Sequence, residues 1–211
     1  MRAINKVLVA VTAVGLAATM AACSSSKSNP KPVGAFKTLS GQSTTVVLDA
    51  GFLKALTTLK LTPGLIGGAK LNGADLSFPI TGGNATIYKK GDITPYVQGV
   101  INHDGSGLSL TAGSTVVKLE NFVVHPGNDS NLTGQVTAGG KVLQDVRLFD
   151  LDGNTLKTPT ISSAGVATLS GTTVYLNPTA AKTLDSVFGT KALEAAKVKV
   201  GTAIIKATGT V

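Results

Sequence analysis

The chain has no tryptophan, a single cysteine and few aromatic residues, which make up 4% of its 211 positions. One cysteine cannot form an internal disulfide, so the chain is not a disulfide-stabilised scaffold. It also lacks the G-x-S-x-G motif of a serine nucleophile, and its stretches GLIGG and ITGGN lack the strand-to-helix context of a phosphate-binding loop. We therefore predict that the protein is not an enzyme. An envelope hydrolase with an unrecognised carboxylate pair among the 11 acidic residues stays open.

The abundant residue types favour a β-rich domain with tight turns. Valine, leucine, isoleucine, alanine and threonine supply most of the apolar and strand-forming content, and there are 25 glycines. About 168 residues remain once the N-terminal segments described next are set aside, enough for one sizeable core. We predict a single domain, residues 44–211, of the mainly β (α+β) class: an antiparallel sheet or sandwich meander with two short helices.

Residues 1–22 have the composition of a lipoprotein signal peptide. Two basic residues among the first six precede an uncharged run of 16, shorter than the about 20 that span a bilayer, and two alanines lead into Cys23. The stretch MAAC resembles a bacterial lipobox, with Met20 where that family usually has leucine. The resemblance implies that Cys23 is lipidated and anchors the protein to the extracytoplasmic face of the cell membrane. The alternative is an ordinary secretory signal followed by a free thiol.

Residues 23–43 are rich in serine, proline and lysine, and we predict a flexible tether there. Loss of the two basic residues of the signal peptide lowers the formal net charge from +8 to +6. Each tether lysine gains about 1 kcal/mol from attraction to anionic lipid. Nucleic acid is the other partner of basic chains, but no basic run interleaved with aromatic residues occurs, so we predict the membrane and no nucleic acid.

Period-two alternation of apolar and polar residues predicts a series of strands in the centre of the chain. The clusters HDGSG, TAG, HPGNDSN, AGGK and DGN separate them and are typical of turns between antiparallel strands. The centre is therefore a predicted meander. The strands are expected at residues 94–102, 108–111, 114–124, 132–137, 142–151 and 166–176.

The two ends of the predicted domain resemble each other. Residues 44–56 match residues 172–184 at equal spacing, with a second match downstream, which indicates a strand–helix–strand (β-α-β) repeat of about 38 residues. Chance similarity between valine-rich and threonine-rich segments is the alternative. Asp49 and Asn177 each follow a strand and are placed to cap a helix. We expect exits from the two helices at Pro63 with Gly64 and at Gly189, respectively.

Five side chains are candidates for binding a small ligand, including haem. The two histidines fall in predicted turns, at the ends of neighbouring strands, and would have to converge with each other or with a tyrosine to hold a metal or haem iron. Exposed histidines in turns are otherwise simply solvated. We predict no catalytic residue, no metal ion and no cofactor. The candidate ligand-binding residues are His103, His125, Tyr88, Tyr96 and Tyr175.

The stretch FDLDGNT resembles the oxygen-rich turn of a calcium loop through Asp150, Asp152 and Asn154. It lacks the later bidentate glutamate of the EF-hand pattern. Because aspartate and asparagine beside glycine are also what a tight turn requires, we favour the turn.

Three longer stretches, GLSLTAGSTVVKLENFVV, LFDLD and VYLNPTAAKTLDSVFG, resemble uncharacterised, secreted β-rich domains of high-GC Gram-positive bacteria. More distantly, the chain resembles the haem-transport-associated domain of actinobacterial surface proteins, which implies haem binding through tyrosine and histidine. It is also similar to the lipid-carrying lipoproteins of mycobacteria in size, lipobox, tether and β-plus-helix content. The resemblance to the lipid-carrying lipoproteins implies an apolar pocket enclosed by a curved sheet and its helices.

These observations support a membrane-anchored, extracytoplasmic lipoprotein that acts as a non-enzymatic binding or envelope-structural module. A small-ligand carrier, for haem or lipid, is the first alternative. A cavity between sheet and helices would favour the carrier, and a filled core would favour the interaction module.

Overall fold

The structure is a computed structural model that describes residues 29–194 and 197–211, and every structural statement below concerns these residues. The predicted signal peptide and the lipidation site Cys23 lie outside them. No helix in the described part of the chain is long and apolar enough to cross a membrane.

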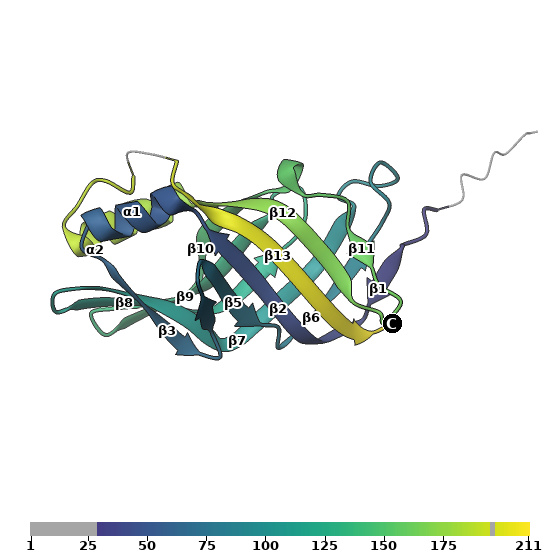
Figure 1. Cartoon of the computed structure of the whole chain (residues 1–211), viewed down its shortest axis with the longest axis horizontal. Coiled ribbons are helices and arrows are strands. Elements are labelled where there is room, and N and C mark those ends of the chain that lie inside the picture. The colour runs from purple at the N-terminus through teal and green to yellow at the C-terminus, as the bar shows by residue number, and fades with distance from the viewer. Residues whose placement is uncertain (1–28, 195–196) are drawn as a thin grey trace, which may run out of the picture.

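One antiparallel sheet of 13 strands makes up most of the described structure (Figure 1). The order is β1-β6-β7-β8-β9-β10-β12-β13-β2-β5-β4, with β3 added on β7 and β11 on β12. The predicted β-rich α+β class is therefore confirmed. The strands are β1 (Gly34–Phe36), β2 (Thr38–Leu48), β3 (Thr62–Gly67), β4 (Lys70–Asn72), β5 (Asp75–Pro79), β6 (Gly82–Ile87), β7 (Val97–Ala112), β8 (Thr115–His125), β9 (Asn131–Ala138), β10 (Lys141–Asp152), β11 (Thr160–Ile161), β12 (Ala167–Leu176) and β13 (Lys199–Thr210).

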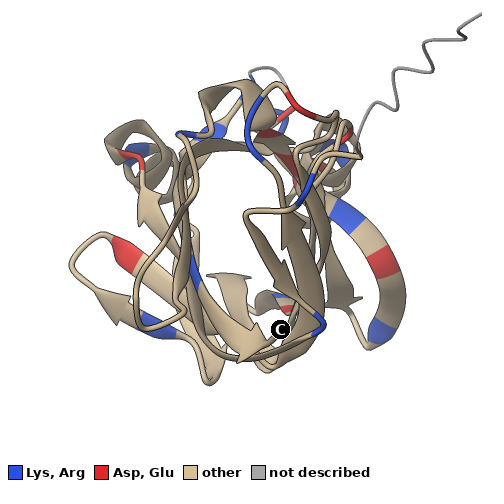
Figure 2. Cartoon of the chain, turned by 90° about the vertical axis from the view of Figure 1, so that its right-hand side faces the viewer, with Lys and Arg blue, Asp and Glu red and all other residues tan. Residues whose placement is uncertain are grey.

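The sheet curls until its two ends approach each other. β1 pairs with β6, while β2, which begins just after β1, pairs with β13 and β5. Between β1 and β2, Lys37 donates its backbone N–H to the carbonyl of Thr210 at 2.8 Å, which joins the first strands to the last. The strands therefore surround a common interior, seen end-on in Figure 2. The main hydrophobic core fills much of it.

The sheet begins earlier in the chain than predicted. The sequence assigns residues 34–43 to the tether, but the structure places most of them in β1 and β2. Phe36 and Leu39 explain the correction, because their side chains are 5% and 1% exposed and belong to the main core. Two buried apolar side chains stabilise a segment whose overall composition is that of a linker.

Each of the two longest helical segments follows a strand of the sheet. They are α1 (Ala50–Thr58) and α2 (Pro178–Phe188). The predicted caps are confirmed: an Asp49 carboxylate oxygen accepts from the N–H of Gly51 at 2.9 Å, and the Asn177 side-chain oxygen accepts from the N–H of Thr179 at 3.0 Å. Both helices lie toward one end of the curled sheet (Figure 1).

The C-terminal ends of the helices agree with the sequence in one case only. α2 ends at Gly189, which adopts the left-handed conformation with φ of 67°, as expected of a glycine after a helix. α1 ends at Thr58, whereas Pro63 and Gly64 lie within β3. Proline is accepted there because β3 pairs with β7 on one side only and is an edge strand.

The cluster HDGSG is not the turn that the sequence predicts. β7 runs through it, and its register with β8 shifts between His103 and Gly107. Side chains of neighbouring segments satisfy the freed backbone groups: the Thr81 hydroxyl accepts from the N–H of Asp104, and the Asn121 side chain accepts from that of Gly105, each at 2.9 Å. A bulge with these partners replaces the chain reversal.

Candidate functional site: an apolar cavity inside the sheet

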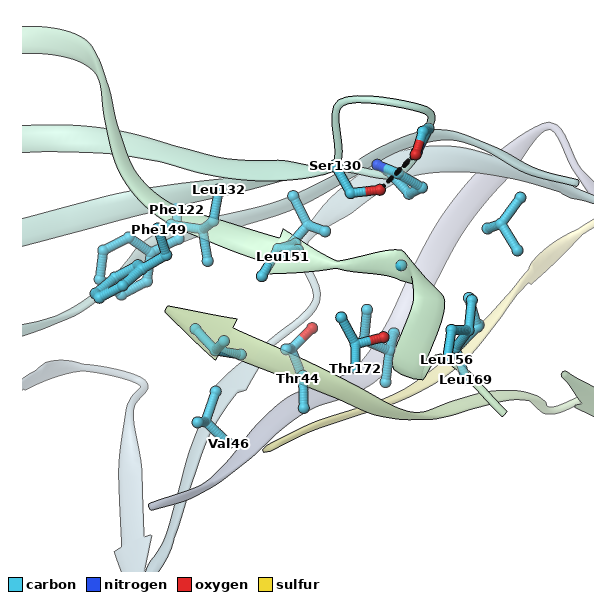
Figure 3. A pocket seen from close by; sticks show the side chains of 18 of the residues that line it. Thr44, Val46, Phe122, Ser130, Leu132, Phe149, Leu151, Leu156, Leu169 and Thr172 are labelled. Carbon is cyan, nitrogen blue, oxygen red and sulfur yellow. Dashed lines mark hydrogen bonds between the residues drawn. The ribbon is translucent and has the colours of Figure 1, made fainter. Parts of the chain in front are cut away.

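The interior of the curled sheet is not completely filled. A cavity of about 280 Å³ lies among side chains of β2, β5, β7, β8, β9, β10, β12 and β13. Figure 3 shows Phe122, Leu132, Phe149 and Leu151 on one side of it and Val46 on the other. Aliphatic and aromatic side chains dominate its wall, and no charged residue of the described chain lines it. Such a wall suits an apolar ligand.

Three loops form the rim of the cavity. We define the rim as residues 94–96, 126–130 and 153–156, because they carry the exposed lining residues of the described chain, among them Thr94, Asn128 and Asn154. The rest of the lining is buried or half-buried in the strands. A ligand would therefore enter between these loops. From the sequence, the loops at 126–130 and 153–156 are predicted only as turns, through the clusters HPGNDSN and DGN.

Hydrogen bonds and an ion pair order the loop at residues 126–130. The Ser130 hydroxyl donates to the carbonyl of Gly127 at 2.6 Å and accepts from its N–H at 3.0 Å (Figure 3). Arg147 donates from both terminal nitrogens to the Asp129 carboxylate, at 2.6 and 2.8 Å. These bonds lower the pKa of Asp129 below its ordinary value. The rim loop is thereby attached to β10.

The predicted oxygen-rich turn in FDLDGNT is occupied by local contacts. An Asp152 oxygen accepts from the backbone and side-chain nitrogens of Asn154, each at 3.1 Å, and caps the short helix η1 (Gly153–Thr155). Asp150 accepts from Arg147 at 2.7 Å and from the Asn177 side chain at 3.0 Å. No group of three or more histidine, cysteine, aspartate or glutamate residues in the described ranges is arranged to hold a metal ion.

His103 lies in the cavity wall and is 1% exposed, so the prediction of a solvated turn histidine is wrong. Its Nδ1 is 3.2 Å from the carbonyl of Phe122, which can only accept, so Nδ1 carries the proton. Its Nε2 then accepts from the Thr44 hydroxyl at 2.7 Å. Burial lowers the pKa of His103 from 6.5 to about 4. The imidazole is neutral, and both nitrogens are engaged.

Tyr96 is the second candidate residue that lines the cavity, at the rim. Its hydroxyl is buried and has no hydrogen-bond partner within the described ranges. Burial raises its pKa above the ordinary value. The ammonium of Lys90 lies 5.9 Å from the centre of its ring.

The other three candidates lie elsewhere. His125 ends β8 and is 3.1 Å from the Thr133 hydroxyl through Nε2. Tyr175 lies on β12 beside Val174, whose side chain lines the cavity, and the ammonium of Lys197 is 4.1 Å from the tyrosine ring centre. Tyr88 pairs through its N–H with the Tyr96 carbonyl at 2.7 Å. None of the three is a lining residue of the cavity.

This arrangement does not fit a haem iron held by the candidate residues. Tyr96 directly precedes β7, and His103 lies seven positions further along the chain. In an extended strand this separation is about 20 Å, so the two side chains cannot both ligate one iron. Both His103 nitrogens already have partners. The resemblance to a haem-binding domain is therefore not matched by a ligand pair in the cavity.

The described part of the chain is thus a curled antiparallel β domain with two α-helices and an apolar interior cavity. No protein-family model matches it, and no curated protein matches it. Its structure is similar to the crystal structure of the C-terminal domain of HtaA from Corynebacterium glutamicum, with a TM-score of 0.54, 14% sequence identity and coverage of 82% of this chain and 98% of that one. A domain-swapped dimer of a variant of that domain gives a TM-score of 0.47, 13% identity and coverage of 76% and 92%. At this identity, the likeness concerns the fold.

Proposed function

We propose that the protein is a membrane-anchored, extracytoplasmic, non-enzymatic carrier of a small apolar ligand, bound in the interior cavity. The supporting observation is the cavity itself, about 280 Å³ with apolar walls and an exposed rim. An engineered apolar cavity of about 150 Å³ holds one benzene molecule, so this one suits a ligand of about twelve carbon atoms. The cavity favours the carrier over the envelope-structural module.

The composition of the cavity wall supports carriage over catalysis. Its lining residues in the described chain include no acid, lysine or arginine. Among the lining residues, the two fully buried polar side chains, His103 and Thr44, are hydrogen-bonded to each other. A general acid or base is most often a carboxylate, a lysine or a free histidine; neither of the first two lines this cavity in the described chain, and both nitrogens of His103 are engaged. The carboxylate-pair hydrolase therefore has no support here.

Anchoring to the membrane rests on the lipobox resemblance at Cys23. Eleven positions separate this residue from Gly34, where β1 begins. A fully extended chain spans at most about 3.6 Å per residue, so the anchor would keep the domain within about 40 Å of the bilayer. A carrier of apolar molecules would gain from this position, because the membrane is both source and acceptor for such ligands.

The test uses the full chain expressed in a bacterium that lipidates such proteins. Native mass spectrometry should find a co-purifying apolar molecule, and intact mass should show acylated Cys23. Ala203, which is 6% exposed and lines the cavity, provides the key variant, because Ala203→Phe fills the space. The matched control is Val142→Phe at a position that is 51% exposed.

We expect Ala203→Phe to lose the ligand and Val142→Phe to retain it, with both variants folded by circular dichroism. Wild-type protein without any bound or exchangeable apolar molecule would contradict the proposal. A Soret shift on titration with haem, at one equivalent and abolished by Ala203→Phe, would instead support the haem carrier.

A further inference from the structure

The strands of the described chain contribute three polar side chains to the cavity wall: Thr44 on β2, His103 on β7 and Thr172 on β12. Two of them bond to each other, since the Thr44 hydroxyl donates to Nε2 of His103. The oxygen of that hydroxyl keeps its lone pairs, so Thr44 can still accept a hydrogen bond. None of the three side chains brings a charge to the cavity, because the imidazole is neutral with both nitrogens engaged.

Thr172 has a free hydroxyl on the cavity side of the sheet. It lies opposite Ala203 on β13, which in turn lies opposite Val46 on β2, and all three residues line the cavity. Directly opposed residues of an antiparallel sheet project from the same face. Thr172 is half-buried, and among the described residues its hydroxyl neither makes a hydrogen bond nor is closed off from solvent. Figure 3 shows Thr44 and Thr172 on one side of the cavity and Leu151 on the other.

We propose that the ligand is an uncharged molecule with a hydrogen-bonding oxygen on an apolar skeleton, and that this oxygen lies inside the cavity, where it accepts a hydrogen bond from Thr172. This inference rests on the proposed function, because it requires an apolar molecule in the cavity. A charged ligand would lose its hydration among aliphatic side chains without any countercharge, which is strongly unfavourable. A pure hydrocarbon would cover the Thr172 hydroxyl and leave it without a partner.

Three probes with one ring system test the class of ligand: naphthalene, 2-naphthol and 2-naphthoate, titrated into delipidated full-length protein by isothermal calorimetry. At neutral pH, 2-naphthol is uncharged and 2-naphthoate is an anion. The shared ring fits within the about twelve carbon atoms that the cavity volume suits.

Two substitutions at Thr172 separate its hydroxyl from its shape. Thr172→Val removes the hydroxyl and keeps a β-branched side chain of similar size, whereas Thr172→Ser keeps the hydroxyl. The matched control is Thr173→Val, because Thr173 is the next residue of β12 and does not line the cavity.

We expect wild type to bind 2-naphthoate about tenfold more weakly than 2-naphthol, or weaker still, because the anion is desolvated without a countercharge. Thr172→Val should weaken 2-naphthol about three- to tenfold, as the loss of one neutral hydrogen bond implies, and should leave naphthalene unchanged. Thr172→Ser and Thr173→Val should bind 2-naphthol like wild type.

Failure of this inference and failure of the carrier function give different results. If wild type binds naphthalene, but 2-naphthoate binds as tightly as 2-naphthol, or Thr172→Val leaves the ratio of the 2-naphthol and naphthalene affinities unchanged, the proposed class of ligand is overturned and the carrier function stands. If wild type binds none of the three probes, and no other apolar compound, the carrier function fails first. Should thermal unfolding show that Thr172→Val is misfolded, Thr172→Ala, which also lacks the hydroxyl, takes its place.

Discussion

Two regions of the cavity wall are held by different kinds of contact: the rim, and the part around the buried pair His103 and Thr44, which we call the inner end. At the inner end, a hydrogen bond of 2.7 Å joins His103 on β7 to Thr44 on β2, two strands that are not neighbours in the sheet. At the rim, Arg147 holds the 126–130 loop through Asp129, whose side chain is 79% exposed. Buried polar pairs are strengthened by the low local dielectric, whereas exposed ion pairs are screened by water and salt. The comparison indicates a fixed inner end and a rim that opens more readily.

Removal of the inner pair should have the largest effect on stability. His103→Ala would leave an internal void, and it would leave the Thr44 hydroxyl and the Phe122 carbonyl without partners. We expect the free energy of unfolding to fall by about 4 kcal/mol, measured by urea denaturation. Thr44→Val tests the same bond from the other side and should cost less. A loss below about 1 kcal/mol for His103→Ala would show that the inner end is not the fixed region.

The pH dependence of stability should come next in size. The pKa of His103 is lowered from 6.5 to about 4 by burial, so between these values the unfolded chain binds more protons than the folded one. The free energy of unfolding is therefore highest above pH 6.5 and should fall by about 3 kcal/mol as the pH drops to 4. Urea denaturation at several pH values measures this slope. The variant His103→Gln should flatten it, and an equal slope in that variant would assign it to the carboxylates.

Much of the fold could be predicted from the sequence, because its signals are local. Alternation in residues 114–124 and 142–151 gave strands close to β8 and β10, and Asp49 and Asn177 cap helices as expected. The HDGSG bulge could not be predicted, since its freed backbone groups depend on partners far away in the chain. Thr81 is one of these partners, and its hydroxyl accepts from a residue 23 positions later.

The candidate site was harder to predict, because a cavity has no local signal. Inward-facing residues such as Val46, Phe122 and Leu169 have the same alternation whether they fill a core or line a space. The volume between them depends on how far the sheet curls. Tyr96 and His103 were both candidate ligands, but their separation along one strand was hidden by the predicted turn between residues 103 and 107. Without that turn, the two side chains occupy different ends of the cavity.

The smallest expected effect concerns the rim, and it sharpens the contrast with the inner end. Arg147→Leu removes both the Asp129 pair and the bond to Asp150, which also accepts from Asn177 at the start of α2. Because Asp129 is largely exposed and Arg147 and Asp150 are only partly buried, the midpoint of global unfolding should move little, by no more than about 1 kcal/mol in free energy.

The local effect should appear in hydrogen exchange measured by mass spectrometry. Peptides covering residues 126–130 should exchange faster in Arg147→Leu, while peptides around His103 should not change, because local opening needs only the rim contacts. High salt should give wild type part of the same behaviour. The matched control is Lys118→Leu, an exposed position of β8 away from the rim loops. Faster exchange around His103 in Arg147→Leu would show that the rim and the inner end open together, and the division between a fixed end and an adaptable one would then be wrong.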